Sequence, residues 1–158
     1  MYILLFMSER TERDRIARLA RTCAGINLRR ASRAITNYYD RLLLEASGLR
    51  ATQVTPLVVL YLAGPRTINQ IAERLDLDRT TLSRNLKLLE DKNLIRIEPG
   101  ADQRTRKITL TDNGRNALLK ALPVWEAAQA HVEQGLGEER FGALLTQLSN
   151  IAELTKEE

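Results

Sequence analysis

Residues 79–92 are predicted to form a helix with one basic face. A buried stripe at the i, i+4, i+7 spacing is provided by Leu82, Leu86 and Leu89, and Asp78 is placed to cap the helix. The opposite face presents only cations and short hydroxyls, namely Arg79, Thr80, Thr81, Ser83, Arg84 and Lys87. A solvated helix usually interleaves both signs of charge, but here the first carboxylate after the cap comes only in the last turn. Side chains of these types can bind phosphate oxygens and base edges.

A basic hairpin is predicted to follow this helix. Residues 94–98 and 106–110 are typical of two short strands, and the turn-rich residues 99–105 join them. The cations on or beside the tip are Arg104, Arg106 and Lys107. An arginine at such a tip, here Arg104, can enter the narrow minor groove of DNA. Asp102 is placed to orient that guanidinium. The alternative is a solvated hairpin with a surface ion pair.

A second short helix is predicted before the basic one. Thr67 and Gln70 fit the S/T-x-x-E/Q capping box that opens a helix, and residues 76–78 provide a three-residue turn. Helix, turn, basic-faced helix and hairpin together are typical of a winged helix-turn-helix, whose second helix enters the DNA major groove. The phosphate backbone would then supply the counter-charge that the basic face lacks. For the basic helix taken alone, a solvated amphipathic helix remains the alternative.

Long helical segments flank this central region. Residues 9–46 are predicted to form one long helical region, which Gly25 and Asn27 can bend because both are weak helix formers. Thr111 is predicted to cap another long helix that runs to about Leu136. The segment after Gly137 is amphipathic, with an apolar stripe at Phe141, Leu144, Leu145, Leu148, Ile151 and Leu154. Such helices exceed the needs of a small core, so we expect helix–helix association between two chains.

Composition and charge indicate the kind of partner. The chain has 158 residues, 44% hydrophobic and 28% charged, which suits one domain with an added interaction element. Its net charge of +4 is uneven, with +5 in residues 1–50, +3 in residues 51–107 and −4 in residues 108–158. An anionic partner would therefore meet the first two-thirds of the chain.

Several classes of protein are not expected. The apolar residues 1–7 are too short for a membrane span and lack the flanks of a signal peptide. Because Met7 is also a plausible start, residues 1–6 are either a non-native extension or a hydrophobic arm that covers another surface. The single cysteine, Cys23, excludes an internal disulfide and suits a reducing cytoplasm. The only histidine, His131, is not expected to bind a metal ion. With no G-x-G-x-x-G, P-loop, H-E-x-x-H or nucleophile elbow, neither an enzyme nor a cofactor is expected.

The run from Leu49 to Gly114 resembles the MarR family, the multiple-antibiotic-resistance type of winged-helix regulators. The matching pieces are LRATQ at 49–53, INQIAERLDLDRTTLSRNLKLLEDKNLI at 68–95, the D-x-R of Asp102 and Arg104, and ITLTDNG at 108–114. The resemblance implies a mainly α fold with a small β-hairpin wing. Its implied parts are an N-terminal extension and dimerisation helix, a winged helix-turn-helix and C-terminal dimerisation helices, over residues 1–48, 49–110 and 111–158.

The same resemblance implies how such a protein acts. It implies a symmetric homodimer whose N- and C-terminal helices interlock and whose two winged lobes bind a pseudo-palindromic DNA operator. A small phenolic or aromatic compound, or an oxidant, is implied as the signal that releases the DNA. The chain departs from the family at Arg50, where a Thr cap is common. The start of the helix in residues 51–63 therefore stays open between Ala51 and a Thr55 cap with Pro56 in first position.

Cys23 is a candidate redox sensor. In the branch of the family that senses organic hydroperoxides, a reactive cysteine occupies a comparable early place with tyrosines nearby, and here Tyr38 and Tyr39 follow. Arg21 or Arg29 is placed to favour the thiolate. The alternative is a small buried hydrophobic residue, which a free cysteine commonly is.

Two functions from different classes follow. The first is a dimeric DNA-binding transcriptional regulator, most simply a repressor. The alternative is a winged-helix module for protein–protein interaction without sequence-specific DNA binding. The two differ in a testable way, because only the first requires that substituting Arg84 or Arg104 weakens DNA binding.

Overall fold

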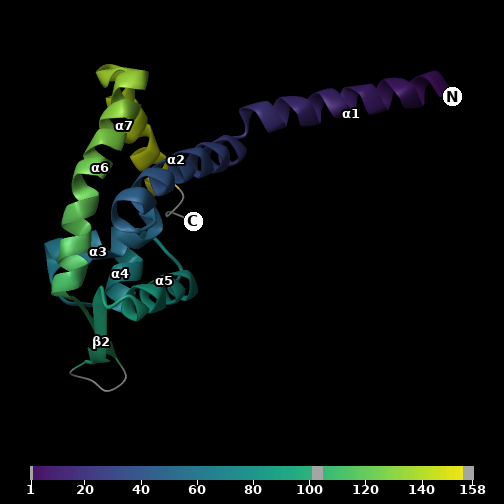
Figure 1. Ribbon diagram of the computed structural model, residues 1–158. Coiled ribbons are helices and arrows are strands. Elements are labelled where there is room, and N and C mark those ends of the chain that lie inside the picture. Colours follow the sequence, from purple (N-terminus) through teal and green to yellow (C-terminus); the bar gives the residue numbers. More distant parts are fainter. Residues whose placement is uncertain (1, 101–104, 155–158) are drawn as a thin grey trace. The chain divides into compact units, whose positions relative to one another are not determined.

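The computed structural model describes residues 2–100 and 105–154, with side chains from residue 11 onward (Figure 1). Its elements in chain order are α1 (Tyr2–Thr22), α2 (Ala24–Ser47), α3 (Ala51–Ala63), β1 (Arg66–Thr67), α4 (Ile68–Leu75), α5 (Arg79–Asp91), β2 (Ile95–Pro99), β3 (Arg106–Leu110), α6 (Asp112–Leu136) and α7 (Glu138–Leu154). The chain divides into two compact units, which meet in sequence between Tyr38 and Tyr39. The expected fold class is confirmed, because a mainly helical chain carries a small antiparallel sheet around a helix-turn-helix.

The larger unit packs around the stripe predicted for α5. Leu82, Leu86 and Leu89 are all at most 1% exposed, so the opposite face of α5 is left to solvent. The same core takes in buried residues from α2 through α6, including Leu43, Leu49, Leu57, Ile71, Ile108 and Ala121. Burial of a leucine side chain stabilises a fold by about 1.5–3 kcal/mol, so this stripe fixes the orientation of α5 strongly.

The sheet has one more strand than expected. Its order is β1-β3-β2 with antiparallel pairing throughout, and Glu98 faces Lys107 across the hairpin. The unpredicted strand β1 has two residues, and Arg66 faces Ile108 of β3. A strand this short has no alternation of apolar and polar residues, so periodicity could not reveal it.

The helix caps confirm the predicted starts of three helices. The Thr67 hydroxyl accepts from the Gln70 amide at 3.3 Å, and the Gln70 side chain accepts from the Thr67 amide at 2.9 Å, which completes the capping box of α4. Asp78 caps α5. Thr111 caps α6, with its hydroxyl 3.0 Å from the Gly114 amide. The turn between α4 and α5 occupies residues 76–78 as expected, with Asp76 left-handed at a φ of 50°.

The start of α3 is resolved in favour of Ala51, with Pro56 inside the helix. The cap comes from another helix. An Asp40 carboxylate oxygen of α2 accepts from the Ala51 amide at 2.7 Å, and the other pairs with the Arg50 guanidinium at 3.3 Å. The Arg50 amide donates to the Gln53 side chain at 3.1 Å. Asp40 therefore caps the N-terminus of α3, a role that a threonine at position 50 commonly has in the family.

The prediction of one helix over residues 9–46 is wrong, because α1 and α2 part at Cys23. The Asn27 side-chain amide donates to the carbonyl oxygens of Arg21 and Cys23, each at 2.9 Å. Side-chain amides that bond to nearby backbone compete with regular helical hydrogen bonds, which explains a break just before Asn27. Among the described residues, no helix is long and apolar enough to span a membrane.

Candidate nucleic-acid interface

Helix α5 presents all six of its predicted contact residues to solvent. The side chains of Arg79, Thr80, Thr81, Ser83, Arg84 and Lys87 are exposed, while the leucine stripe anchors the other side of the helix. The six therefore form one continuous surface on a rigid support, which is the arrangement needed to place side chains in a groove of fixed shape.

The first turn of α5 is organised around Asp78. Its carboxylate accepts from the Thr81 amide at 2.8 Å. Hydrogen bonds from the Thr81 side chain and backbone hold the pKa of Asp78 below its ordinary value, and the charge of Arg84 contributes in the same direction. One turn on, the Ser83 hydroxyl donates to the Arg79 carbonyl at 2.7 Å, so its oxygen remains free to accept a hydrogen bond.

Lys87 corrects the prediction that nothing neutralises the basic face. Its ammonium lies 2.8 Å from an Asp91 carboxylate oxygen and 3.5 Å from one of Glu90. These contacts, with Asp91 the stronger, raise the pKa of Lys87. The i, i+3 and i, i+4 spacing of these residues allows such pairs on any helix, so the sequence contained the signal. Lys87 is therefore already paired, whereas no ion pair among the described side chains involves Arg79 or Arg84.

The hairpin brings a further cation beside α5. Arg106 begins β3 and faces Pro99 of β2, and its side chain is exposed. A cleft of about 390 Å³ lies between α5, the start of α4 and the hairpin, and its lining includes Arg79, Ser83, Lys87 and Arg106. The cleft also takes in Thr67 and Asn69 at the start of α4, which sequence reasoning missed as part of this surface. Two other predicted residues, Asp102 and Arg104, lie outside the described residues.

The hairpin is held against α6 by a close junction. The Leu94 carbonyl accepts from the Thr111 amide at 3.1 Å, and the Thr111 hydroxyl lies 2.7 Å from the Asn93 carbonyl. Gly114 packs so tightly here that a Cβ atom would collide with the Leu94 carbonyl oxygen and lie 2.8 Å from Leu110 Cδ1. The glycine of the ITLTDNG motif is therefore required by close approach of two backbones.

Cys23 lies in the smaller unit, between α1 and α2, and is half-buried. The arginines named beside it in sequence, Arg21 and Arg29, are exposed, and Tyr38 is half-buried. Among the described residues no group of histidine, cysteine and acidic side chains could hold a metal ion.

Comparison with known proteins identifies the family. A profile of the MarR family matches residues 47–105, which span α3 to the hairpin. A crystal structure of the Mycobacterium tuberculosis transcriptional regulator MosR in complex with DNA is 37% identical, with a TM-score of 0.78, over 85% of this chain and 97% of that one. The chain belongs to the MarR family.

Other MarR-like structures support the fold. The transcriptional repressor CouR, bound to a 23-mer DNA duplex, is 25% identical over 85% of this chain and 95% of that one, with a TM-score of 0.77. Bordetella bronchiseptica BpsR, at 21% identity over 84% of this chain and 95% of that one, shares the fold with a TM-score of 0.76. No curated protein sequence matches the chain. Membership of the MarR family makes this protein a DNA-binding transcriptional regulator and not an enzyme.

Proposed function

We propose that this MarR-family protein is a homodimeric repressor that binds a pseudo-palindromic DNA operator and releases it when a small phenolic or aromatic ligand, or an oxidant, reaches it in the cytoplasm. The observation that carries the proposal is the exposed face of α5 beside Arg106, on a helix whose other face is locked into the core. MosR, which was crystallised in complex with DNA, supports it at 37% identity.

Each residue of the α5 face is assigned a role by its chemistry. Arg84 is the proposed base reader, because a guanidinium can fork onto guanine O6 and N7 and this one is exposed on the face of α5. The remaining members of the face serve phosphates or bases, namely Arg79, Thr80, Thr81, Ser83 and Lys87. Arg106, with Arg104 oriented by Asp102, is proposed to contact the minor groove and its flanking phosphates.

Dimerisation is proposed because several helices leave large apolar side chains uncovered. Helix α7 has no buried residue, and Leu144, Leu145, Leu148 and Leu154 on its stripe are exposed. Helix α6 adds the exposed Leu136, next to the turn into α7. A contiguous apolar stripe along a helix marks an interface, and a second copy offers the same stripe.

The release signal is proposed to act through the smaller unit or through the dimer. If an oxidant is the signal, Cys23 is its target. The single cysteine then requires an external thiol, or Cys23 of the second subunit, to complete a disulfide. If a small ligand is the signal, Cys23 is not needed for release.

The proposal is tested with DNA that flanks the protein's own coding region. We expect an inverted repeat there to bind the purified protein more tightly than a scrambled duplex, as measured by fluorescence anisotropy, with one dimer per repeat by sedimentation. Deleting residues 138–158 should abolish the dimer and operator binding together. Equal affinity for operator and scrambled DNA would favour the protein–protein interaction module instead.

A further inference from the structure

The N-terminal helices carry a run of arginines with no acidic residue among them. Between Asp14 and Asp40 the sequence has no carboxylate side chain. The cations in this interval are Arg15, Arg18, Arg21, Arg29, Arg30 and Arg33. All six side chains are exposed, the first three on α1 and the last three on α2. Glu12 and Asp14 lie three and four residues before Arg15 and Arg18, but no ion pair joins them among the described side chains, so the run is open to an anionic partner.

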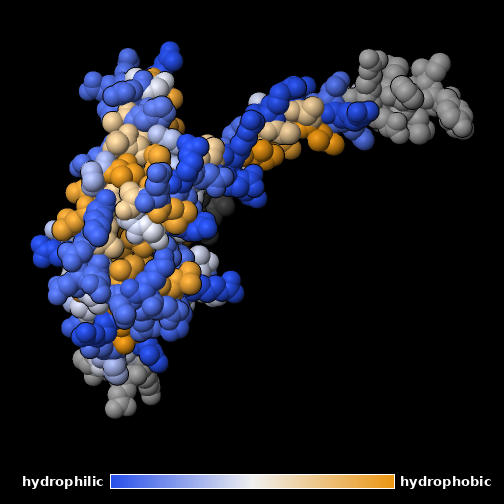
Figure 2. Space-filling view, viewed as in Figure 1, coloured by the Kyte–Doolittle hydropathy of each residue, from blue (hydrophilic) through white to orange (hydrophobic). Residues whose placement is uncertain are grey.

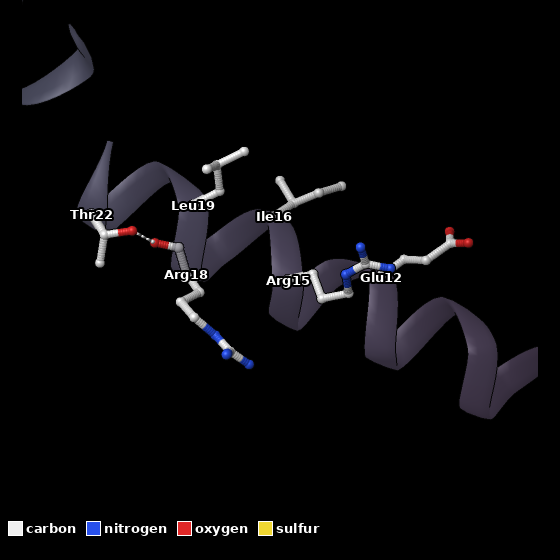
Figure 3. A pocket seen from close by; sticks show the side chains of 6 residues that line it. All are labelled: Glu12, Arg15, Ile16, Arg18, Leu19 and Thr22. Atoms are coloured by element: carbon white, nitrogen blue, oxygen red, sulfur yellow. Dashed lines mark hydrogen bonds between the residues drawn. The ribbon is translucent and has the colours of Figure 1, made fainter. Parts of the chain in front are cut away.

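Helix α1 turns Arg18 and Arg21 away from its apolar residues. Arg15, Arg18 and Arg21 recur at three-residue steps, so they form a row that winds around the helix, and Arg15, four residues before Leu19, borders the apolar side. Figure 3 shows Ile16 and Leu19 pointing to one side of α1 and Arg18 to the opposite side. In Figure 2 the described part of α1 is blue along one edge and tan to orange along the other. Because Ile16 and Leu19 are 67% and 66% exposed, α1 offers two distinct uncovered faces.

The two faces suit different partners. The apolar face fits the second copy of the proposed dimer, because burying such side chains is favourable. Arg18 and Arg21, which are turned away from that face, would then remain in solvent even in the dimer. Among the side chains that the structure describes, no ion pair involves these six arginines, in contrast to Lys87 with its two carboxylates.

The type of cation points to phosphate. The chain uses arginine for every cation before Lys87. The planar guanidinium binds phosphate through two parallel hydrogen bonds and stays charged at all working pH values. A run of guanidinium groups matches the regular spacing of charge along a DNA backbone.

We propose that the arginine row of α1, continued by Arg29, Arg30 and Arg33 of α2, is a second DNA-binding surface that grips backbone phosphates outside the contacts of α5 and the hairpin. The proposed contacts are to backbone phosphates, which carry no sequence information. Once the winged lobe has bound, contact by this surface is intramolecular, so a weak electrostatic attraction suffices. The inference rests on the proposed operator binding and adds a region of contact to it.

The size of the effect follows from counterion release. Each phosphate neutralised contributes about −0.9 to the slope of log K against log salt. Three α1 arginines that each bind one phosphate would contribute about −2.7 per subunit. Raising the salt concentration from 50 to 200 mM would therefore lower the DNA affinity by about 40-fold for each subunit whose three α1 arginines bind phosphate.

The test replaces Arg15, Arg18 and Arg21 together by Gln, which keeps helix propensity. Operator affinity is measured between 50 and 200 mM salt, and the protected DNA length by footprinting. We expect the Gln variant to lack this additional salt dependence, about 40-fold in each subunit, and to protect a DNA segment that is shorter at both ends. The triple Arg→Lys variant should keep the salt slope. Replacing the exposed Lys120 and Arg140 of the C-terminal helices by Gln removes two cations outside the row, and this control for the loss of positive charge elsewhere should change neither quantity.

Three results would overturn the inference. Equal slopes and footprints for wild type and the Gln variant would show that the arginines are merely solvated. A variant that dissociates into monomers by sedimentation would place the row against the second copy. Binding of the wild type to anionic phosphatidylserine vesicles, lost in the variant while DNA binding is unchanged, would identify a lipid surface instead. If the wild-type protein does not prefer operator over scrambled DNA, the proposed function fails. A salt slope that still differs between wild type and the Gln variant on either DNA would nevertheless support phosphate binding by the arginine row.

Discussion

Replacing Asp91 by Asn should tighten DNA binding and slightly lower the free energy of unfolding. Asp91 is the closer partner of the Lys87 ammonium, at 2.8 Å, and Glu90 is the weaker one at 3.5 Å. The substitution keeps the side chain nearly isosteric and removes one negative charge from the end of α5, the helix proposed to face DNA. Lys87, which lines the cleft beside the hairpin, is then freed to contact a phosphate.

The two effects differ in size and sign. The Lys87 and Asp91 side chains are 67% and 55% exposed, so solvent screens their pair, and its loss should lower the stability of α5 only slightly. One added phosphate contact per subunit should steepen the slope of log K against log salt by about 0.9. Between 50 and 200 mM salt, that is about a 3.5-fold larger change in affinity for each subunit.

The assay is operator binding by anisotropy at several salt concentrations, with urea unfolding to measure stability. Lys87→Gln and the double variant Lys87→Gln/Asp91→Asn complete a cycle. If Lys87 mediates the gain, Asp91→Asn should have little effect on the slope once Lys87 is gone. An unchanged slope for Asp91→Asn, or the same gain with and without Lys87, would refute the reasoning.

Three further outcomes are expected. Gly114→Ala should lower the free energy of unfolding by about 1–3 kcal/mol in urea, because its Cβ meets the Leu94 carbonyl, whereas Gly142→Ala on open α7 should be neutral or stabilising. Asp78→Ala should lower the free energy of unfolding at pH 7, because it removes the cap of α5. Since the pKa of Asp78 is lowered in the folded protein, this difference should shrink as the pH falls through that pKa, and a difference that stays constant on acidification would contradict the role of the charged cap. Cys23→Ser should abolish release by cumene hydroperoxide if an oxidant is the signal, and release that persists in this variant would remove Cys23 as the sensor.

Local signals were enough to predict the central elements. The leucine stripe and the Asp78 cap defined α5, and the Thr67–Gln70 box defined α4, because each depends on residues within one or two turns. The exposed face of α5 could then be predicted, because a helix that is buried along one stripe leaves its other side chains in solvent. The family motif at residues 108–114 gained a physical reason only from the structure, which shows Gly114 against a backbone carbonyl.

Features that depend on partners distant in sequence could not be predicted. Asp40 caps α3 from eleven residues away, and β1 exists only because β3 lies beside it. The break at Cys23 is local by contrast, because the Asn27 side-chain amide donates to the carbonyl oxygens of Arg21 and Cys23; the sequence indicated a bend at Gly25 and Asn27 but not these acceptors. The ion pairs of Lys87 could be suspected from the sequence, because its carboxylate partners lie three and four residues further along the helix. The same spacing also permits unpaired side chains, so the sequence alone could not establish them.

The central claim is that α5 reads base sequence, and Arg84→Ala tests it most directly. Affinity for the operator and for a scrambled duplex of equal length should be measured at one fixed salt concentration. We expect operator binding to weaken by about 1–3 kcal/mol, about 5- to 150-fold, while binding to the scrambled duplex changes much less. An equal loss on both duplexes would show that Arg84 contacts only phosphate, and the assignment of base reading to Arg84 on α5 would be wrong.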